Sequence, residues 1–199
     1  MKAGMPVGKI ARRLQVAPTV KTLKVLERRP TPPGMHGGKK FGSKSVYATQ
    51  LIEKQKLRFQ FMISEKVLRR AFKLAKSKKG STGDNILQML DSRLDATVFR
   101  SGVVRSMLAA RQLVSHGNVL VNGKRVDKPG FLVSTTDVVS FSKKAMTFPF
   151  LIEGIRDGIP VGYIELNKEA GTIRRSVVPP RKDIPVMCSE QTVVEWYSR

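Results

Sequence analysis

The chain has 199 residues, with 37 lysines and arginines against 15 aspartates and glutamates, a formal net charge of +22. This length suffices for one or two domains, and the excess of positive charge indicates a polyanionic partner, most often a nucleic acid. No apolar run approaches the roughly 20 residues of a membrane-spanning helix, so we expect no membrane segment. A single cysteine excludes an internal disulfide. One cysteine and two histidines are also too few ligands for a closed tetrahedral zinc site.

The first 45 residues are strongly basic and show few apolar residues at helical or strand spacing. Residues 1–44 hold 11 basic side chains and one acidic one, and prolines and glycines predict a loop from Arg28 to Lys40. We expect a basic amino-terminal extension over residues 1–45 that becomes ordered along RNA, with a flexible tail as the alternative. Its candidate RNA contacts are Arg12, Arg13, Arg28, Arg29, His36, Lys39 and Lys40.

The next segment, to about Asp91, predicts helices. Tyr47 and Leu51 begin an apolar face, whose opposite side holds Glu53, Lys54, Lys56 and Arg58. A second helix is expected after Ser64 as its N-cap and a third from Asp84. The second carries many cations, which form either a solvated face or a second RNA surface. The candidate RNA contacts of these helices are Lys54, Lys56, Arg58, Arg69 and Arg70.

A further amphipathic helix is predicted over Arg105 to His116. On a helical wheel its apolar arc contains Met107, Ala110, Leu113 and Val114. The opposite arc is polar and cationic, and it contains Arg105, Leu108, Arg111, Gln112, Ser115 and His116.

Asn122-Gly123 predicts a tight hairpin directly after this helix. Alternating apolar residues lie on both sides of the pair, which tolerates the two positive φ values of a type I′ turn. Lys124 and Arg125 leave the turn beside the polar arc of the helix. We call the polar arc together with these two residues the helix–hairpin surface, and its compact positive charge suits a phosphate backbone.

The remaining chain is less distinctive. Residues 132–141 predict two short strands, Tyr163–Leu166 and Val177–Val178 are strand-like, and Val193–Tyr197 predicts a short helix or an extended end. Residues 142–199 hold nine basic and seven acidic side chains, so we expect this segment to pack on the helical part. No carboxylate pair suggests catalysis. Asp91 and Asp95 have the spacing for helix capping and arginine pairing, and Cys188 is expected to be a structural thiol.

Several motifs resemble known families. Arg93-Leu94-Asp95, Val121-Asn122-Gly123 and Asp137 resemble the S4 RNA-binding domain. The segments 32–37, 53–59, 64–66 and 193–199 resemble the bacterial-type S4 family of small-subunit ribosomal proteins, and this resemblance runs from about Ile10 to the last residue. The chain departs from the family pattern at Met107, where a basic residue is common, and at Thr136, where glycine is usual.

The resemblance implies an α+β fold in which a mostly helical domain (residues 46–91 and 142–199) is interrupted by an S4-type domain (residues 92–141) of two helices on a short antiparallel sheet. It implies direct binding to small-subunit rRNA at a multi-helix junction, which nucleates subunit assembly. It also implies a place near the mRNA entry, where the family supports translational accuracy and where mRNA and neighbouring proteins (the family implies ribosomal protein five) are partners. It implies a structural role without enzyme activity. Some family members bind zinc through cysteines near the amino terminus, but this chain has none there, so we expect no metal, and we expect no cofactor, membrane contact or small-molecule substrate. The family's RNA-facing positions fall on Arg93, Arg100, Arg111, Gln112, Ser115, His116, Asn122, Lys124 and Arg125.

Two other classes remain open from the residues alone. An RNA-modifying enzyme with an appended S4-type domain would need a separate catalytic fold, and a stress-linked RNA-binding or DNA-architectural module would lack the proline–glycine loop and the aromatic carboxyl end. The expected location is a bacterial cytoplasmic ribosome. A mitochondrial or plastid ribosome is the alternative, because no acidic residue precedes Glu27.

Overall fold

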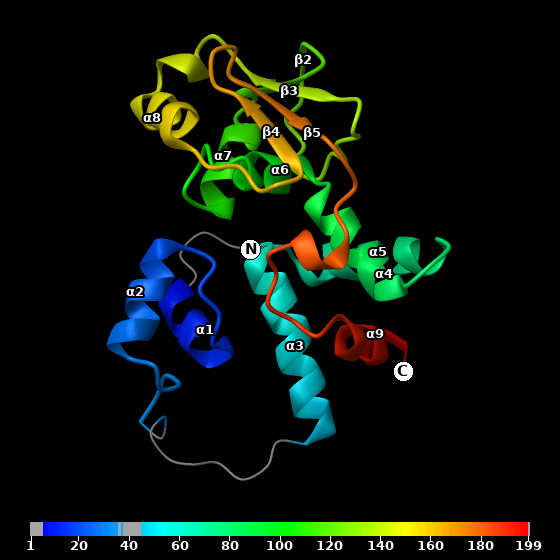
Figure 1. Cartoon of the computed structure of the whole chain (residues 1–199). Coiled ribbons are helices and arrows are strands. Elements are labelled where there is room, and N and C mark those ends of the chain that lie inside the picture. The colour runs from blue at the N-terminus through cyan, green and yellow to red at the C-terminus, as the bar shows by residue number, and fades with distance from the viewer. Residues whose placement is uncertain (1–5, 36, 38–44, 199) are drawn as a thin grey trace. The chain divides into compact units, whose positions relative to one another are not determined.

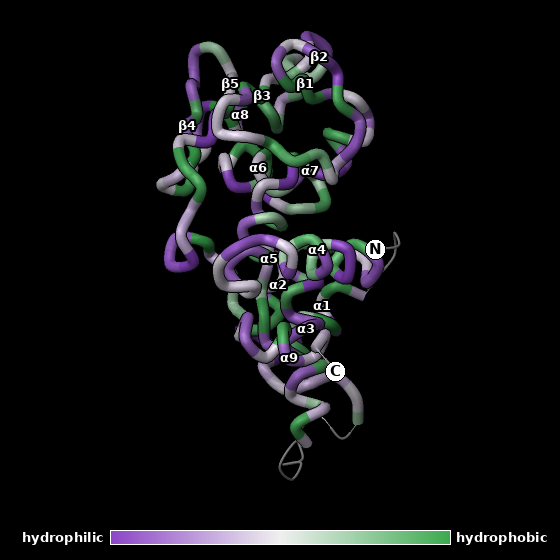
Figure 2. The backbone as a smooth tube through the Cα atoms, turned by 90° about the vertical axis from the view of Figure 1, so that its right-hand side faces the viewer, coloured by the Kyte–Doolittle hydropathy of each residue, from purple (hydrophilic) through white to green (hydrophobic). Residues whose placement is uncertain are grey.

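The protein is described by a computed structural model over residues 6–35, 37 and 45–198, in which two compact units are distinguished (Figure 1). Unit 1 consists of Met1–Ile86 and Val186–Arg199, and unit 2 of Leu87–Pro185. Figure 2 shows hydrophilic and apolar residues alternating along the chain in both units, as expected for elements with one buried face. Within the described ranges, every helix is too short or too polar to cross a membrane.

Unit 1 is helical in its described part. Its elements are α1 (Val7–Leu14), α2 (Val20–Arg28), α3 (Val46–Gln60), α4 (Glu65–Lys76), the start of α5 (Thr82–Asp91) and α9 (Glu190–Ser198). Helix α9, from the carboxyl end of the chain, packs on α3 and α4. The core contains Leu57, Phe59, Phe61, Leu68 and Val193, all nearly inaccessible to solvent.

Helices α1 and α2 correct the expectation of an extension without helices. Thr19 and Thr22 form a reciprocal capping box at the start of α2, which satisfies backbone amides that would otherwise lack partners. Ala11 and Leu14 of α1 are buried, and α1 packs on both α2 and α3. The two helices have only eight and nine residues, and cations interrupt their apolar pattern. The pattern is therefore too short to predict a helix from the sequence.

Unit 2 combines helices and one sheet, which confirms the α+β class. The helices are α6 (Leu94–Arg100), α7 (Met107–Ser115) and α8 (Pro149–Asp157), with short 3₁₀ turns η1 (Ala145–Thr147) and η2 (Arg181–Asp183). The strands are β1 (Val119–Val121), β2 (Lys124–Arg125), β3 (Val138–Phe141), β4 (Ile164–Asn167) and β5 (Thr172–Arg175). Among the described residues the sheet is antiparallel throughout, in the order β2-β1-β3-β5-β4.

One face of the sheet forms the core of unit 2. Val121 pairs with Val139, which pairs in turn with Ile173, so the three side chains lie in a row on the buried face. Residues from α6, α7 and α8 fill the space against this row, among them Val98, Val114 and Leu151. The helices and the sheet therefore bury their apolar faces on one another.

The carboxyl-terminal third divides differently from the sequence-based expectation. Strands β4 and β5 extend the sheet beyond β3, so residues 142–185 belong to unit 2, and only residues 186–199 pack on the helical unit. Val177–Val178 form no strand, and between 132 and 141 a lone bridge at Leu132 precedes β3. Strand β5 was missed because it alternates Thr172 and Arg174 with its buried positions and so has little continuous apolar character.

Candidate nucleic-acid interface

Asp95 is the centre of a buried ion-pair cluster beneath the helix–hairpin surface. Its carboxylate is inaccessible to solvent and accepts two hydrogen bonds from Arg93, from Nε at 3.0 Å and from Nη2 at 2.9 Å. Arg111 donates to Oδ2 from Nε at 3.0 Å and from Nη2 at 2.6 Å. Such charge-assisted pairs fix the geometry of both partners. The prediction that Asp95 pairs with arginine is confirmed. Arg111 links α7 to α6 through Asp95, whereas Arg93 pairs with Asp95 within the first turn of α6.

Asp91 is the centre of a second cluster. Arg100 donates to its Oδ1 at 3.2 Å, and Arg175 of β5 donates to its backbone carbonyl at 2.8 Å. Burial, opposed by the Asp91 charge, lowers the pKa of Arg175, while burial and the same carboxylate raise the pKa of Tyr163. Arg175 was missed by sequence reasoning. Its neighbour Arg174 is exposed on the opposite face of the strand. Assigning a strand to these residues would have predicted that one of the two arginines is buried, because successive side chains of a strand point to opposite faces.

The hairpin has the predicted geometry. Asn122 and Gly123 have φ values of 51° and 77°, as a type I′ turn requires. The Asn122 side chain donates to Asp137 Oδ1 at 2.8 Å and accepts from the Val138 amide at 2.9 Å. Asn122, expected to face RNA, therefore ties the hairpin to β3. In the preceding turn Asp137 also accepts from the Ser134 amide, and this turn forms with Thr136 outside the positive-φ region.

The exposed part of the helix–hairpin surface follows the predicted wheel. Met107, Ala110, Leu113 and Val114 are buried, whereas the polar residues of the opposite arc are exposed, except for the half-buried Arg111. The helix itself begins at Met107, after Ser106 as its N-cap. The exposed polar members are Arg105, Gln112, Ser115, His116, Lys124 and Arg125.

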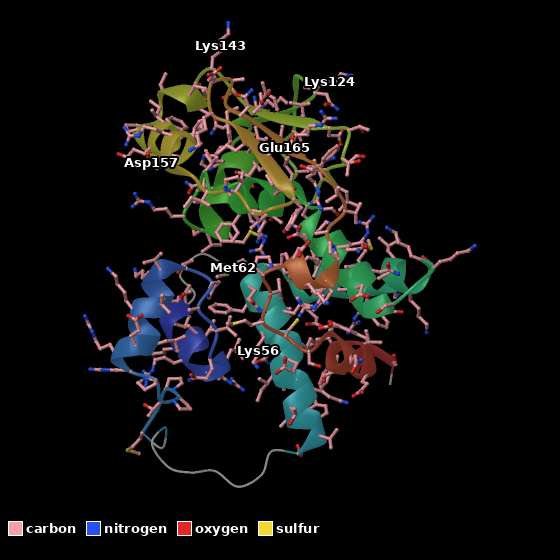
Figure 3. The ribbon with its side chains drawn as sticks, in the orientation of Figure 1. Lys56, Met62, Lys124, Lys143, Asp157 and Glu165 are labelled. Carbon is pink, nitrogen blue, oxygen red and sulfur yellow. The ribbon has the colours of Figure 1, made fainter. Side chains whose placement is uncertain are left out.

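Close contact joins the hairpin to the end of α7. Gly117 has a φ of 69°, and a Cβ at this position would overlap the Arg125 guanidinium. Arg125 therefore lies directly over the residue that follows the helix. Lys124, which precedes Arg125 in β2, projects outward from the hairpin (Figure 3). Arg105 is 93% exposed in its side chain and only 3.8 Å from Glu153, a weak surface pair.

Helix α4 carries a second cationic surface in unit 1. Leu68, Ala71, Phe72 and Ala75 are buried on one face. On the other face and just beyond the helix, exposed cations without an acidic partner among the described residues are Lys66, Arg69, Arg70, Lys73, Lys76, Lys78 and Lys79. A solvated face and an RNA surface both remain compatible with this pattern.

The three cations of α3 that were expected to contact RNA form ion pairs within unit 1. Lys54 is 8% exposed, lies 4.5 Å from the Trp196 ring centre and pairs with Glu65 at 3.3 Å. Arg58 also pairs with Glu65, at 3.2 Å. Lys56 pairs with Glu53 at 2.7 Å. This face is covered because α9 packs against it, a long-range contact that local periodicity does not reveal.

Glu65 gathers these charges. Burial by itself would raise its pKa, but the Tyr197 hydroxyl, which donates at 2.6 Å, and the Lys54 and Arg58 charges hold the pKa of Glu65 below its usual value. Burial and the Glu65 carboxylate raise the pKa of Tyr197. The cluster therefore fixes α9 to α3 and α4.

The amino-terminal cations are only partly described. Arg12 donates to the carbonyls of Thr31 and Pro32, at 2.9 and 3.2 Å, and so holds the loop that follows α2. Arg13, Arg28 and Arg29 are exposed. The remaining expected contacts, His36, Lys39 and Lys40, lie outside the described residues.

No group of three or more potential metal-ligating His, Cys, Asp or Glu side chains occurs in the described segments. Cys188 is half-buried at the start of the carboxyl-terminal segment that leads into α9. The chemistry that the described side chains offer is thus cationic and hydrogen-bonding.

Comparison with known proteins covers nearly the whole chain. The family described as "Ribosomal protein S4/S9 N-terminal domain" matches residues 3–91, and the "S4 domain" family matches residues 92–139. Proteins called "Small ribosomal subunit protein uS4" are 44% identical in Streptomyces avermitilis and Streptomyces griseus, over 98% of this chain and 97% of each relative. The corresponding protein of Pelodictyon phaeoclathratiforme is 40% identical, over 97% of both chains.

The chain belongs to the S4 family of small-subunit ribosomal proteins. The family resemblance inferred from the sequence motifs is confirmed, and with it the assignment as a structural, non-enzymatic ribosome component with an RNA-binding S4 domain. The boundary between the two family matches, at residues 91 and 92, falls between the two buried aspartates, where α5 ends and the loop into α6 begins.

Proposed function

We propose that this S4-family protein binds small-subunit rRNA directly at a multi-helix junction, joins the particle early in assembly and lies near the mRNA entry of a bacterial-type ribosome. The helix–hairpin surface is the observation that carries this proposal. Its exposed cations and hydrogen-bonding side chains lie on a rigid frame, fixed by Asp95 on one side and by the Asn122–Asp137 bond on the other. A pre-positioned cationic surface suits the shape and phosphates of folded RNA.

The roles of the arginines follow from their partners. Arg93, Arg100 and Arg111 maintain the frame, so they support RNA binding mainly by positioning the exposed residues. Lys124, Arg125 and the polar end of α7 make the direct contacts. The basic face of α4 adds long-range attraction and further phosphate contacts, which makes binding strongly dependent on salt.

Assembly and location are tested by washing intact small subunits. The protein should remain with the particle through a high-salt wash, because a structural constituent is held by many simultaneous contacts, and crosslinked RNA should map to one junction and to segments near the mRNA entry. Release of the protein at moderate salt, or crosslinks scattered over unrelated RNAs, would contradict the proposal.

The neighbouring partners are part of the same proposal. Ribosomal protein five and mRNA are expected at the protein's own surfaces within the particle, and the bacterial cytoplasm is the expected compartment, with an organelle ribosome as the alternative. Crosslinking of intact particles followed by peptide identification tests the protein neighbour. Crosslinks to other ribosomal proteins but not to protein five would contradict the proposal that protein five is a neighbour.

A further inference from the structure

A small aromatic pocket lies at the carboxyl end of α7 in unit 2. It is lined by Ala109, Gln112, Leu113, His116, Asn118, Phe148 and Phe150, with a volume of about 260 Å³. This is below the roughly 300–1,000 Å³ of pockets for drug-sized ligands, so it suits a flat ring system better than a larger ligand. Phe148 and Phe150 form its wall, with near-parallel rings (19°) whose centres are 5.7 Å apart.

The polar groups around the pocket are open to a ligand. Gln112 and His116 are exposed, and their side chains make no hydrogen bond within the described chain. Asn118 is fixed through its backbone, which donates to Leu113 and accepts from Ser142. The side-chain Oδ1 of Asn118 accepts from the Ser142 hydroxyl at 3.5 Å, and its side-chain Nδ2 has no partner among the described residues. Amide and imidazole groups of this kind donate to and accept from the edges of nucleobases.

Positive charge flanks the pocket, and no acidic residue lines it. The Arg125 guanidinium covers Gly117, which lies between two lining residues in the chain. Lys143 and Lys144 are exposed in the turn that connects Ser142, which bonds Asn118, to Phe148. Figure 3 shows Lys143 projecting outward from this turn. A ligand that places a flat ring in the pocket and negative charge on either side would match this arrangement.

From these observations we infer that the pocket receives one unpaired nucleobase extruded from the bound RNA. The base stacks on Phe150, continuing the Phe148–Phe150 pair, while Gln112, His116 and Asn118 bond its edge and the flanking cations hold the adjoining phosphates. The inference rests on the proposed rRNA binding and makes it more specific, because it adds a base contact to a surface otherwise suited to shape and phosphate. An apolar peptide anchor would use the aromatic wall but would leave the three polar groups unused.

The test measures binding and base reactivity together. The full chain and its Phe150→Ala and Gln112→Ala variants are titrated with small-subunit rRNA, and the complexes are treated with dimethyl sulfate and a carbodiimide, which together report unpaired bases of all four kinds. Ile152→Ala is the matched control, since Ile152 is 51% exposed on the same helix but does not line the pocket. Circular dichroism melting checks that each variant is folded.

We expect Phe150→Ala to raise the dissociation constant about 5- to 150-fold, the range for loss of one stacked base, with the salt dependence unchanged because no cation is removed. Ile152→Ala should change it by less than about twofold, as a surface substitution without a contact. One base should be protected by the wild-type chain and by Ile152→Ala, and should become reactive again with Phe150→Ala and Gln112→Ala.

Two results would overturn the inference while rRNA binding stands. The first is equal affinity of all variants with no base changing its reactivity. The second is unchanged RNA binding with loss of a protein neighbour from Phe150→Ala particles, which would make the pocket a protein site. Failure of the wild-type chain to bind rRNA at all would instead remove the proposed function beneath it.

Discussion

At the level of single residues, acidic side chains decide how the arginines of this protein are used. Asp91 and Asp95 have no exposed surface, and together they engage four arginines. A buried charge that loses its partner is strongly unfavourable, even where the pair itself adds little net stability. The arginines of these clusters are therefore part of the folding energetics before they are part of any RNA contact.

Substitution of Asp95 should show this directly. Asp95→Ala leaves Arg93 and Arg111 without their shared partner, and we expect a loss of about 3–5 kcal/mol in the free energy of unfolding. Urea titration of the variant against Glu169→Ala, an exposed carboxylate without an ion-pair partner among the described residues, measures the loss. A difference below about 1 kcal/mol, the range of ordinary surface substitutions, would show that the cluster is not structural.

Substitution of Arg111 must be followed by both stability and rRNA affinity, because this arginine also neutralises the buried Asp95. The sequence predicts that Arg111→Ala weakens rRNA binding more than Lys79→Ala, and this stays a prediction. The structure adds that Arg111→Ala leaves Asp95 with Arg93 alone, so its midpoint in urea should fall, whereas Lys79→Ala should leave the midpoint unchanged. Filter binding at a temperature where both variants are folded separates the two effects. Equal losses of affinity there would count against the helix–hairpin surface.

The Glu65 cluster predicts a pH dependence of stability. In the folded state the pKa of Glu65 is below its ordinary value of 4.5. The ionised carboxylate therefore contributes fully to the free energy of unfolding above pH 4.5, and this contribution is lost as the pH falls through the folded-state pKa. We expect the urea midpoint of the wild-type chain to fall more steeply than that of Glu65→Gln as pH is lowered from 5 to 3. Parallel curves for the two proteins would contradict the assigned role of Glu65.

At the level of elements, the joint between α7 and the hairpin is tightly constrained. Gly117 combines a positive φ with the Arg125 guanidinium packed against its Cα. We expect Gly117→Ala to destabilise the chain by about 1–2 kcal/mol, the usual cost of a left-handed non-glycine residue, and to displace Arg125. Gly162→Ala is the control, because nothing lies within 4 Å of the added methyl group and its φ is not positive.

Thermal melting and rRNA affinity of these two variants give the check. Gly117→Ala should lower both the melting temperature and the affinity, while Gly162→Ala should leave both near the wild-type values. Unchanged affinity for Gly117→Ala, with the expected loss of stability, would show that the position of Arg125 does not matter for binding.

Elements with strong local signals were predictable from the sequence. The Asn122-Gly123 turn and the two arcs of α7 depend on neighbouring residues alone, and both have the expected form. The burial of Lys54 and the pairing of β5 with β3 depend on partners far along the chain, α9 in the first case and the sheet in the second. Local periodicity contains no information on such partners, which is why the burial of Lys54 and the extent of the sheet were not predicted.

The same distinction explains the candidate site. Sequence reasoning predicted which arc of α7 is apolar and which is polar, but it did not separate exposed cations from those that neutralise a buried carboxylate. Arg111 and Gln112 are neighbours on the polar arc, yet Arg111 binds Asp95 whereas the Gln112 side chain makes no hydrogen bond within the described residues. Only the packing of α6 against α7 decides between these roles.

At the level of the whole molecule, net charge and defined geometry have separate effects. A charge of +22 attracts any polyanion over the screening length of the solution, so it cannot by itself distinguish one RNA from another. The selectivity must come from cations held at fixed places. If this division is correct, removing charge at the helix–hairpin surface should cost more affinity than removing equal charge elsewhere in the same unit.

The most direct test compares two double variants in rRNA binding across a salt series. Lys124→Ala with Arg125→Ala removes charge from the helix–hairpin surface, and Lys168→Ala with Lys182→Ala removes the same charge from other exposed positions of unit 2. We predict that the first lowers the slope of log affinity against log salt by roughly 1.4–1.8, since each lost phosphate contact accounts for about 0.7–0.9, while the second leaves the slope nearly unchanged. Equal slopes and equal affinities for the two double variants would contradict the account.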